Sequence, residues 1–160
     1  MNIILEAEGK LFKNCTRNHV VYCFQLDESV EKLNINFCYE PKLVTDKEEI
    51  KEIFEYYSAD YPENDKKLLL EEKENIKSLS NFLTISIDDE KGFRGCGHRH
   101  NPNQKLFISK EKASEGFIPG EIKKGMWKVT ISTHAILSEA VNYKLIIREG
   151  DGEDESMESM

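Results

Sequence analysis

The sequence predicts an all-β fold: an antiparallel, jelly-roll-like β-sandwich with a helical insertion at about residues 45–79. Short runs rich in β-branched and aromatic residues recur along the chain, with glycine or proline marking the turns between them, as in β-sandwiches. Several runs alternate apolar and polar residues, which indicates strands with one buried and one exposed face. We find no βαβ alternation and no repeat of about 20 to 50 residues, so parallel α/β and solenoid folds are not expected.

The first forty residues form the first block of predicted strands. Residues 2–8 are a short apolar run that ends at Gly9, and Asn18–Leu26 is rich in valine and aromatic residues. Residues 33–39 give the clearest strand pattern, because every second residue is large and apolar: Leu33, Ile35, Phe37 and Tyr39. We therefore expect these four side chains to face the core.

Helical periodicity replaces the strand pattern after Pro41. Thr45 and Glu48 have the spacing of a capping box, in which each side chain satisfies a backbone N–H at the start of a helix. An apolar stripe with helical spacing follows: Ile50, Ile53, Phe54 and Tyr57. The stripe is most simply a core-facing one, with a groove for a partner as the alternative. Pro62 predicts the end of this helix, and the charged segment 65–77 is predicted to form a weaker helix or an ordered loop.

Strand patterns resume at residues 81–88, where Leu83, Ile85 and Ile87 share one face. The remaining strand-like runs are residues 105–109, 126–132 and 141–147. We therefore expect residues 1–148 to form one domain.

The formal charge is −8, from 22 basic and 30 acidic side chains, and much of it lies at the C-terminal end. Residues 149–160 contain six acidic and no basic residues and are predicted to be a disordered acidic tail. The remaining residues carry a formal charge of −2. Since binding to nucleic acid requires a basic surface, no nucleic-acid partner is expected.

No run of about 18 apolar residues is present, so no membrane association is expected. The first residues lack the basic and apolar regions of a secretory signal, which predicts a cytoplasmic protein. The four cysteines form no C-x-x-C pair, and free thiols are expected.

The densest polar cluster lies at residues 94–103. Cys96, His98 and His100 occupy alternate positions and would point the same way in an extended chain. Thiolate and imidazole groups are typical zinc ligands, and His134 could join them if its strand ends nearby. A divalent metal such as zinc is therefore one hypothesis for this cluster.

Two other interpretations of the cluster remain open. The basic side chains could bind an anion or a carbohydrate, with these residues as hydrogen-bond donors: Arg94, His98, Arg99 and His100. Alternatively, the same side chains could be structural and could hydrogen-bond the backbone of nearby turns.

Several ordered segments in the second half of the chain carry a resemblance to a known family. They are residues 88–95 (DDEKGFRG), 107–109 (FIS), 113–120 (ASEGFIPG), 125–127 (GMW) and 143–145 (YKL). Together they resemble the N-terminal β-sandwich of CehA/McbA-type metallohydrolases of the PHP superfamily. The resemblance implies an accessory domain, because the catalytic metal ligands of those enzymes lie in a separate domain after the sandwich, which opens with H-x-H followed by S-D-G. Here His98 and His100 lie inside the sandwich and no S-D-G follows.

The sequence thus favours a non-catalytic binding or interaction module without a cofactor, accessory to a PHP-type hydrolase encoded elsewhere. Its expected partner is another protein or a second copy of the chain. One alternative is a small metal-binding protein or metal-dependent hydrolase that uses Cys96, His98 and His100. A carbohydrate-binding module is the third hypothesis, although the single tryptophan, Trp127, is expected to lie in the core rather than on a sugar-binding surface.

Overall fold

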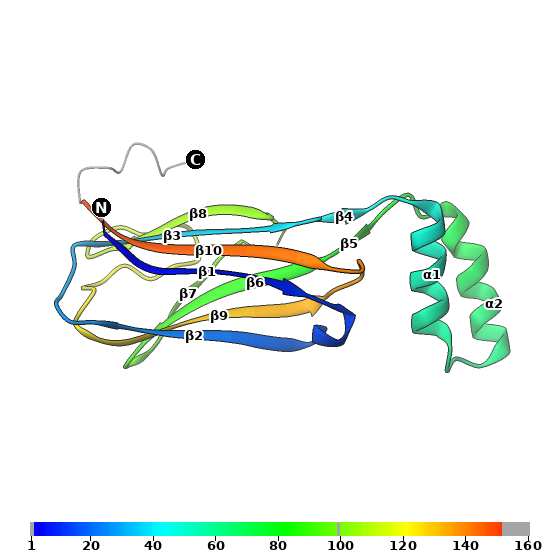
Figure 1. The fold of residues 1–160 in the computed structure, drawn as a ribbon, viewed down its shortest axis with the longest axis horizontal. Helices are drawn as coiled ribbons and strands as arrows, with labels where there is room; N and C mark the ends of the chain where they lie inside the picture. Colours follow the sequence, from blue (N-terminus) through cyan, green and yellow to red (C-terminus); the bar gives the residue numbers. More distant parts are fainter. Residues whose placement is uncertain (1, 99, 152–160) are drawn as a thin grey trace.

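The structure is a computed structural model that describes residues 2–98 and 100–151, and it confirms a β-sandwich with a helical insertion (Figure 1). Two four-stranded antiparallel sheets pack face to face. The first sheet contains, in spatial order, β1 (Ile3–Leu11), β10 (Val141–Gly150), β3 (Lys32–Glu40) and β8 (Asn103–Ser109). The second contains β2 (Asn18–Leu26), β9 (Gly125–Ala135), β6 (Phe82–Asp89) and β7 (Gly92–Cys96).

The core lies between the two sheets and follows the period-two patterns. The alternating apolar residues of β3 are buried as predicted: Leu33, Ile35, Phe37 and Tyr39. From the other sheet, Leu83, Ile85 and Ile87 of β6 are fully buried against them. Full burial of each such side chain contributes about 1.5–3 kcal/mol, so this interface between the sheets dominates the stability of the fold.

Trp127 closes one end of this core from β9. Its ring is 2% exposed and stacks on Phe24, with ring centroids 6.3 Å apart. The indole N–H donates to the carbonyl of Lys123 at 3.0 Å, so the one polar atom of the buried ring is satisfied. The expectation that Trp127 belongs to the core is confirmed.

The helical insertion leaves the sandwich between β3 and β6. Two short strands, β4 (Leu43–Val44) and β5 (Leu79–Ser80), pair with each other and lead to helices α1 (Lys47–Ser58) and α2 (Glu63–Glu72). One 3₁₀ turn, Lys73–Asn75, follows α2, and another, Lys13–Cys15, follows β1. Figure 1 shows the helical pair standing beyond one end of the sandwich.

The capping box predicted at Thr45 is wrong by one residue. Asp46 is the N-cap, and its carboxylate accepts a hydrogen bond from the backbone N–H of Glu49 at 3.0 Å. The backbone of Asp46 is still extended and becomes helical only at Lys47, so the aspartate side chain takes the position from which an orphan N–H can be reached.

The stripe predicted on α1 is only half buried by the rest of the protein. Ile50 and Ile53 are buried, whereas Tyr57 is 41% exposed. The two isoleucines pack in a small separate cluster with Val44, together with the partly buried side chains of Phe54, Leu79 and Leu137. Because the helices lie beyond the end of the sandwich, no sheet reaches the far end of the stripe.

The chain ends differ slightly from the predicted boundaries. Strand β10 continues to Gly150, where Glu149 and Gly150 pair with Leu33 and Lys32 of β3. Residues 152–160 of the predicted tail lie outside the described residues. Within residues 2–98 and 100–151, no helix is long and apolar enough to cross a membrane.

Candidate functional site

Arg94 of β7 is buried and hydrogen-bonded inside the protein rather than directed at solvent. Its guanidinium donates to the Asp89 carboxylate at 3.0 Å and lies over the Trp127 ring, 5.2 Å from the centroid. Nε and the terminal nitrogens also donate to backbone carbonyls at 3.1–3.3 Å, those of Ile118, Gly120 and Glu121. These five bonds match the five N–H groups of an arginine. Arg94 therefore fits the structural interpretation, in which the side chain hydrogen-bonds the backbone of nearby turns.

The carboxylate of Asp89 is held ionised by this arrangement. Burial by itself raises the pKa of Asp89, but hydrogen bonds from Arg94 and from the backbone N–H groups of Lys91 and Gly92 outweigh it. The net result is a pKa below the usual range of an aspartate. At neutral pH the buried arginine therefore faces a charged partner.

Two glycines let the loop before β9 lie directly against β7. Gly95 and Gly116 both have positive φ, +138° and +89°. A Cβ on Gly95 would lie 2.5 Å from the Cα of Phe117, and one on Gly116 would collide with the carbonyl of Cys96. The backbone N–H of Cys96 donates to the carbonyl of Gly116 at 3.0 Å. Three of the segments that carry the family resemblance, residues 88–95, 113–120 and 125–127, thus meet around Arg94, in architectural roles.

The predicted histidine cluster adopts a different geometry from the one expected. Strand β7 ends at Cys96, so His98 and His100 do not continue an extended strand. The buried side chain of Gln104 holds this turn, accepting from the N–H of His98 and donating to the carbonyls of His98 and Asn101, each at 2.9 Å. The backbone N–H of His100 donates to Nδ1 of His98 at 3.2 Å.

Phe82 separates the histidines that could have shared a metal. Its ring meets His100 edge-on at 5.4 Å and His134 at 5.1 Å between centroids, and Nε2 of His134 lies 2.9 Å from the Thr84 hydroxyl. Among the residues that the structure describes, no group of three or more His, Cys, Asp or Glu side chains could hold a metal ion. Arg99, the remaining predicted ligand residue, lies outside the described residues.

The helical insertion presents a surface of which the sequence predicted only Tyr57, through the partner-groove alternative for the α1 stripe. Five large side chains of this insertion are exposed, and we call them together the hairpin surface: Tyr56, Tyr57, Tyr61, Leu68 and Leu70. Tyr56 and Leu68 are each 60% exposed, and α2 buries no residue. One signal was available, because three consecutive leucines, residues 68–70, cannot all face one side of a helix.

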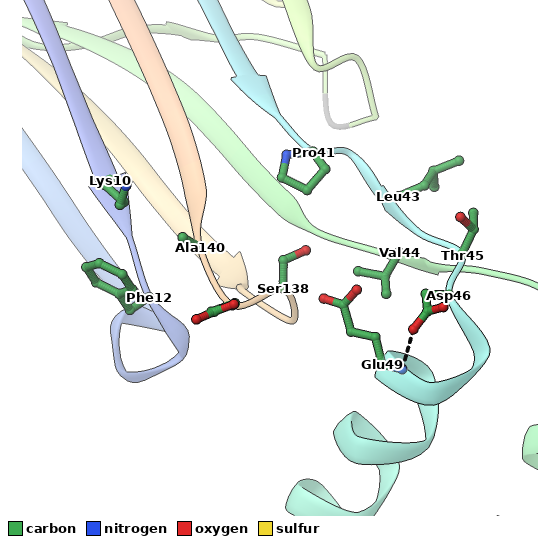
Figure 2. Close-up of a pocket in the computed structure, with 11 residues that line it drawn as sticks. Lys10, Phe12, Pro41, Leu43, Val44, Thr45, Asp46, Glu49, Ser138 and Ala140 are labelled. Carbon is green, nitrogen blue, oxygen red and sulfur yellow. Dashed lines mark hydrogen bonds between the residues drawn. The ribbon is translucent and has the colours of Figure 1, made fainter.

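A groove lies where the hairpin meets the sandwich. We call it the hairpin-base groove and define it by Phe12 after β1, Leu43, Glu49 and Tyr56 from the insertion, and Glu139 from the loop before β10. It consists of two cavities of about 610 and 810 Å³ that share Phe12, Glu49 and Glu139. Figure 2 shows Glu49 reaching from the first turn of α1 toward Ser138, with Phe12 on the sandwich side.

Comparisons with known proteins identify no family. No family model and no curated protein matches this chain. The crystal structure of the Yersinia pseudotuberculosis-derived mitogen (YPM) aligns over 97% of this chain and 92% of that one, with 12% identity and a TM-score of 0.38. A similarity this low carries no inference about function.

Proposed function

We propose that this protein is a non-catalytic interaction module and that a partner protein docks on the hairpin surface. The observation that carries the proposal is the hairpin itself, which stands beyond the sandwich with its large side chains exposed. Five large side chains are exposed on this one short hairpin, and exposed apolar surface beyond single scattered residues marks protein interaction sites. Tyrosine is also enriched among the residues that contribute most to binding.

The weak anchoring of the hairpin supports the same function. Short helices are marginal in isolation and depend on tertiary packing. Here the packing consists of Ile50 and Ile53 against Val44, with Phe54, Leu79 and Leu137 partly buried around them. A partner that covers α2 would supply the apolar contacts that the sandwich does not.

The rest of the described chain behaves as a scaffold. Arg94 and Trp127 are buried and satisfied, and their roles are architectural. This is the role that the resembled accessory sandwiches imply, and we extend the proposal to a partner of the PHP hydrolase type, encoded elsewhere.

Site-specific photo-crosslinking tests this function. A photoreactive phenylalanine analogue replaces Tyr61 on the hairpin or, as the matched control, Val21 on β2, which is also exposed. We expect irradiation in the protein's own cells to link a discrete protein to position 61 and not to position 21. Absence of a crosslink at 61, or the same products at both positions, would refute the proposal.

A further inference from the structure

We infer that the hairpin-base groove binds a basic, extended segment of the partner protein, an inference that rests on the proposed function and names the chemistry of the partner. Three features meet in this open groove: carboxylates of the α1 helix, the carboxylate of Glu139 on the loop before β10, and the exposed apolar side chains of Phe12 and Leu43. The argument uses the charge of the groove, its apolar lining and its continuity with the hairpin surface.

The side chains that line the groove carry an excess of negative charge. Glu49 is half-buried on α1, Glu52 follows it by three residues, and Glu139 lies on the loop before β10. In the described ranges, none of these three carboxylates lies within 4.0 Å of a basic side chain. Ammonium or guanidinium groups of a partner would supply the missing counter-charge.

Basic residues of the chain itself offset this charge only in part. Lys10 and Lys13 also line the groove, against four acidic residues when the N-cap Asp46 is included. The ammonium of Lys13 lies over the Tyr56 ring, 5.4 Å from its centroid. The face of the Tyr56 ring thus already forms a cation–π contact with a basic side chain. The insertion as a whole, residues 45–79, has eleven acidic and six basic residues.

The apolar lining favours a polypeptide over a free cation. Phe12 is 48% exposed, and Leu43 is similarly open, so a bound segment needs apolar groups as well as charges. Tyr56 belongs both to the groove and to the hairpin surface. One partner can therefore cover α1 and α2 with its body and place a basic segment in the groove.

The test selects peptides without bias and then asks where they bind. The bait is the full chain, and the probe is a phage-displayed library of random 12-residue peptides. We expect the selected peptides to be enriched in lysine and arginine beside apolar residues, and their affinity to fall with added salt. Their binding should shift the backbone NMR signals of residues 12–14, 46–52 and 138–140.

A charge-matched pair of variants locates the interaction. In E49Q/E139Q we expect the selected peptides to bind about ten-fold more weakly, or worse. E48Q/E55Q removes two charges from exposed carboxylates of α1 that do not line the groove and should bind within about two-fold of the wild type. Circular dichroism of both variants confirms that the helices remain folded.

The outcomes separate this inference from the proposed function. No enrichment of basic peptides, equal losses in the two variants, or NMR shifts elsewhere would overturn the groove inference. So would self-association of the chain that E49Q/E139Q abolishes, because the occupant would then be a second copy. If a crosslink at position 61 persists while the peptides fail, the groove inference falls alone; if both fail, the proposed function falls as well.

Discussion

At the scale of single residues, Arg94 joins its own β-hairpin to the loop and strand of residues 118–127, more than twenty positions further along the chain. It pairs with Asp89 in the β6–β7 hairpin, donates to carbonyls of residues 118–121 and covers Trp127 of β9. Spacing along the chain could indicate that Arg94 belonged to a polar cluster but not which atoms it would meet. The sequence therefore left ligand-binding and structural roles open, and the packing favours the structural one.

Replacing Arg94 with methionine should lower the free energy of unfolding by about 3 kcal/mol, since the change leaves a partly buried carboxylate and three backbone carbonyls without their donor. Lys144→Met is the control, because its pair with Glu6 spans 4.0 Å and both side chains are about half exposed; that loss should stay below about 1 kcal/mol. Urea unfolding measures both. Equal losses would contradict the role assigned to Arg94.

The pKa of Asp89 predicts a specific dependence of stability on pH. Because folding lowers this pKa, the ionised carboxylate contributes stability above the unfolded value of about 3.8, and the contribution is lost as pH falls through the folded pKa. The stability difference between wild type and Asp89→Asn should be constant above about pH 5 and shrink as the solution becomes more acidic. A constant difference down to about pH 2 would contradict the stabilised carboxylate.

Two glycines form a matched pair for testing the close approach of loop and strand. Gly92 and Gly95 have nearly the same φ, +133° and +138°, but a Cβ meets nothing within 4 Å at Gly92 and meets Phe117 at Gly95. Both alanine variants carry a backbone strain of about 1 kcal/mol or more. In Gly95→Ala we expect the free energy of unfolding to fall by a further amount of about 1–3 kcal/mol, because the new Cβ overlaps Phe117. Urea unfolding measures this difference. Indistinguishable variants would argue against the contact.

At the scale of elements, periodicity predicted which faces are apolar but not how far a neighbour covers them. The alternation in β3 was sufficient because a second sheet lies along its whole length. The stripe on α1 was not, because its buried isoleucines pack on β4, β5 and Leu137 rather than on a sheet that follows the whole helix. Strand β7 was not predicted, since it contains two glycines and an exposed phenylalanine among five residues.

The separate cluster under α1 predicts local rather than global unfolding. Ile53→Ala removes one of the two buried isoleucines of this helix and should cost about 2–5 kcal/mol of local stability. Hydrogen–deuterium exchange should then quicken throughout α1 and α2 and stay unchanged in β3 and β9. Leu68→Ala, at an exposed position of α2, is the control and should change neither. Faster exchange across the sandwich would show that the two clusters are energetically coupled.

At the scale of the whole molecule, the sandwich is a well-packed body that carries a weakly packed helical pair at one end. The sequence predicted both parts and their order along the chain. It could not predict that the hairpin would point away from the sheets, because this depends on which loops meet at the end of the sandwich. The hairpin surface and its groove arise from that placement.

Native mass spectrometry of the tagged full chain, isolated from its own cells, tests the central claim most directly. Our account predicts one complex of defined mass and fixed stoichiometry for the wild type and for Val21→Ser, an exposed change on the sandwich. The same complex should be lost in Tyr61→Ser/Leu68→Ser, where both side chains are exposed and the fold should be unaffected. A wild-type chain found only as monomer, or a complex that survives the hairpin changes, would contradict a partner on the hairpin surface.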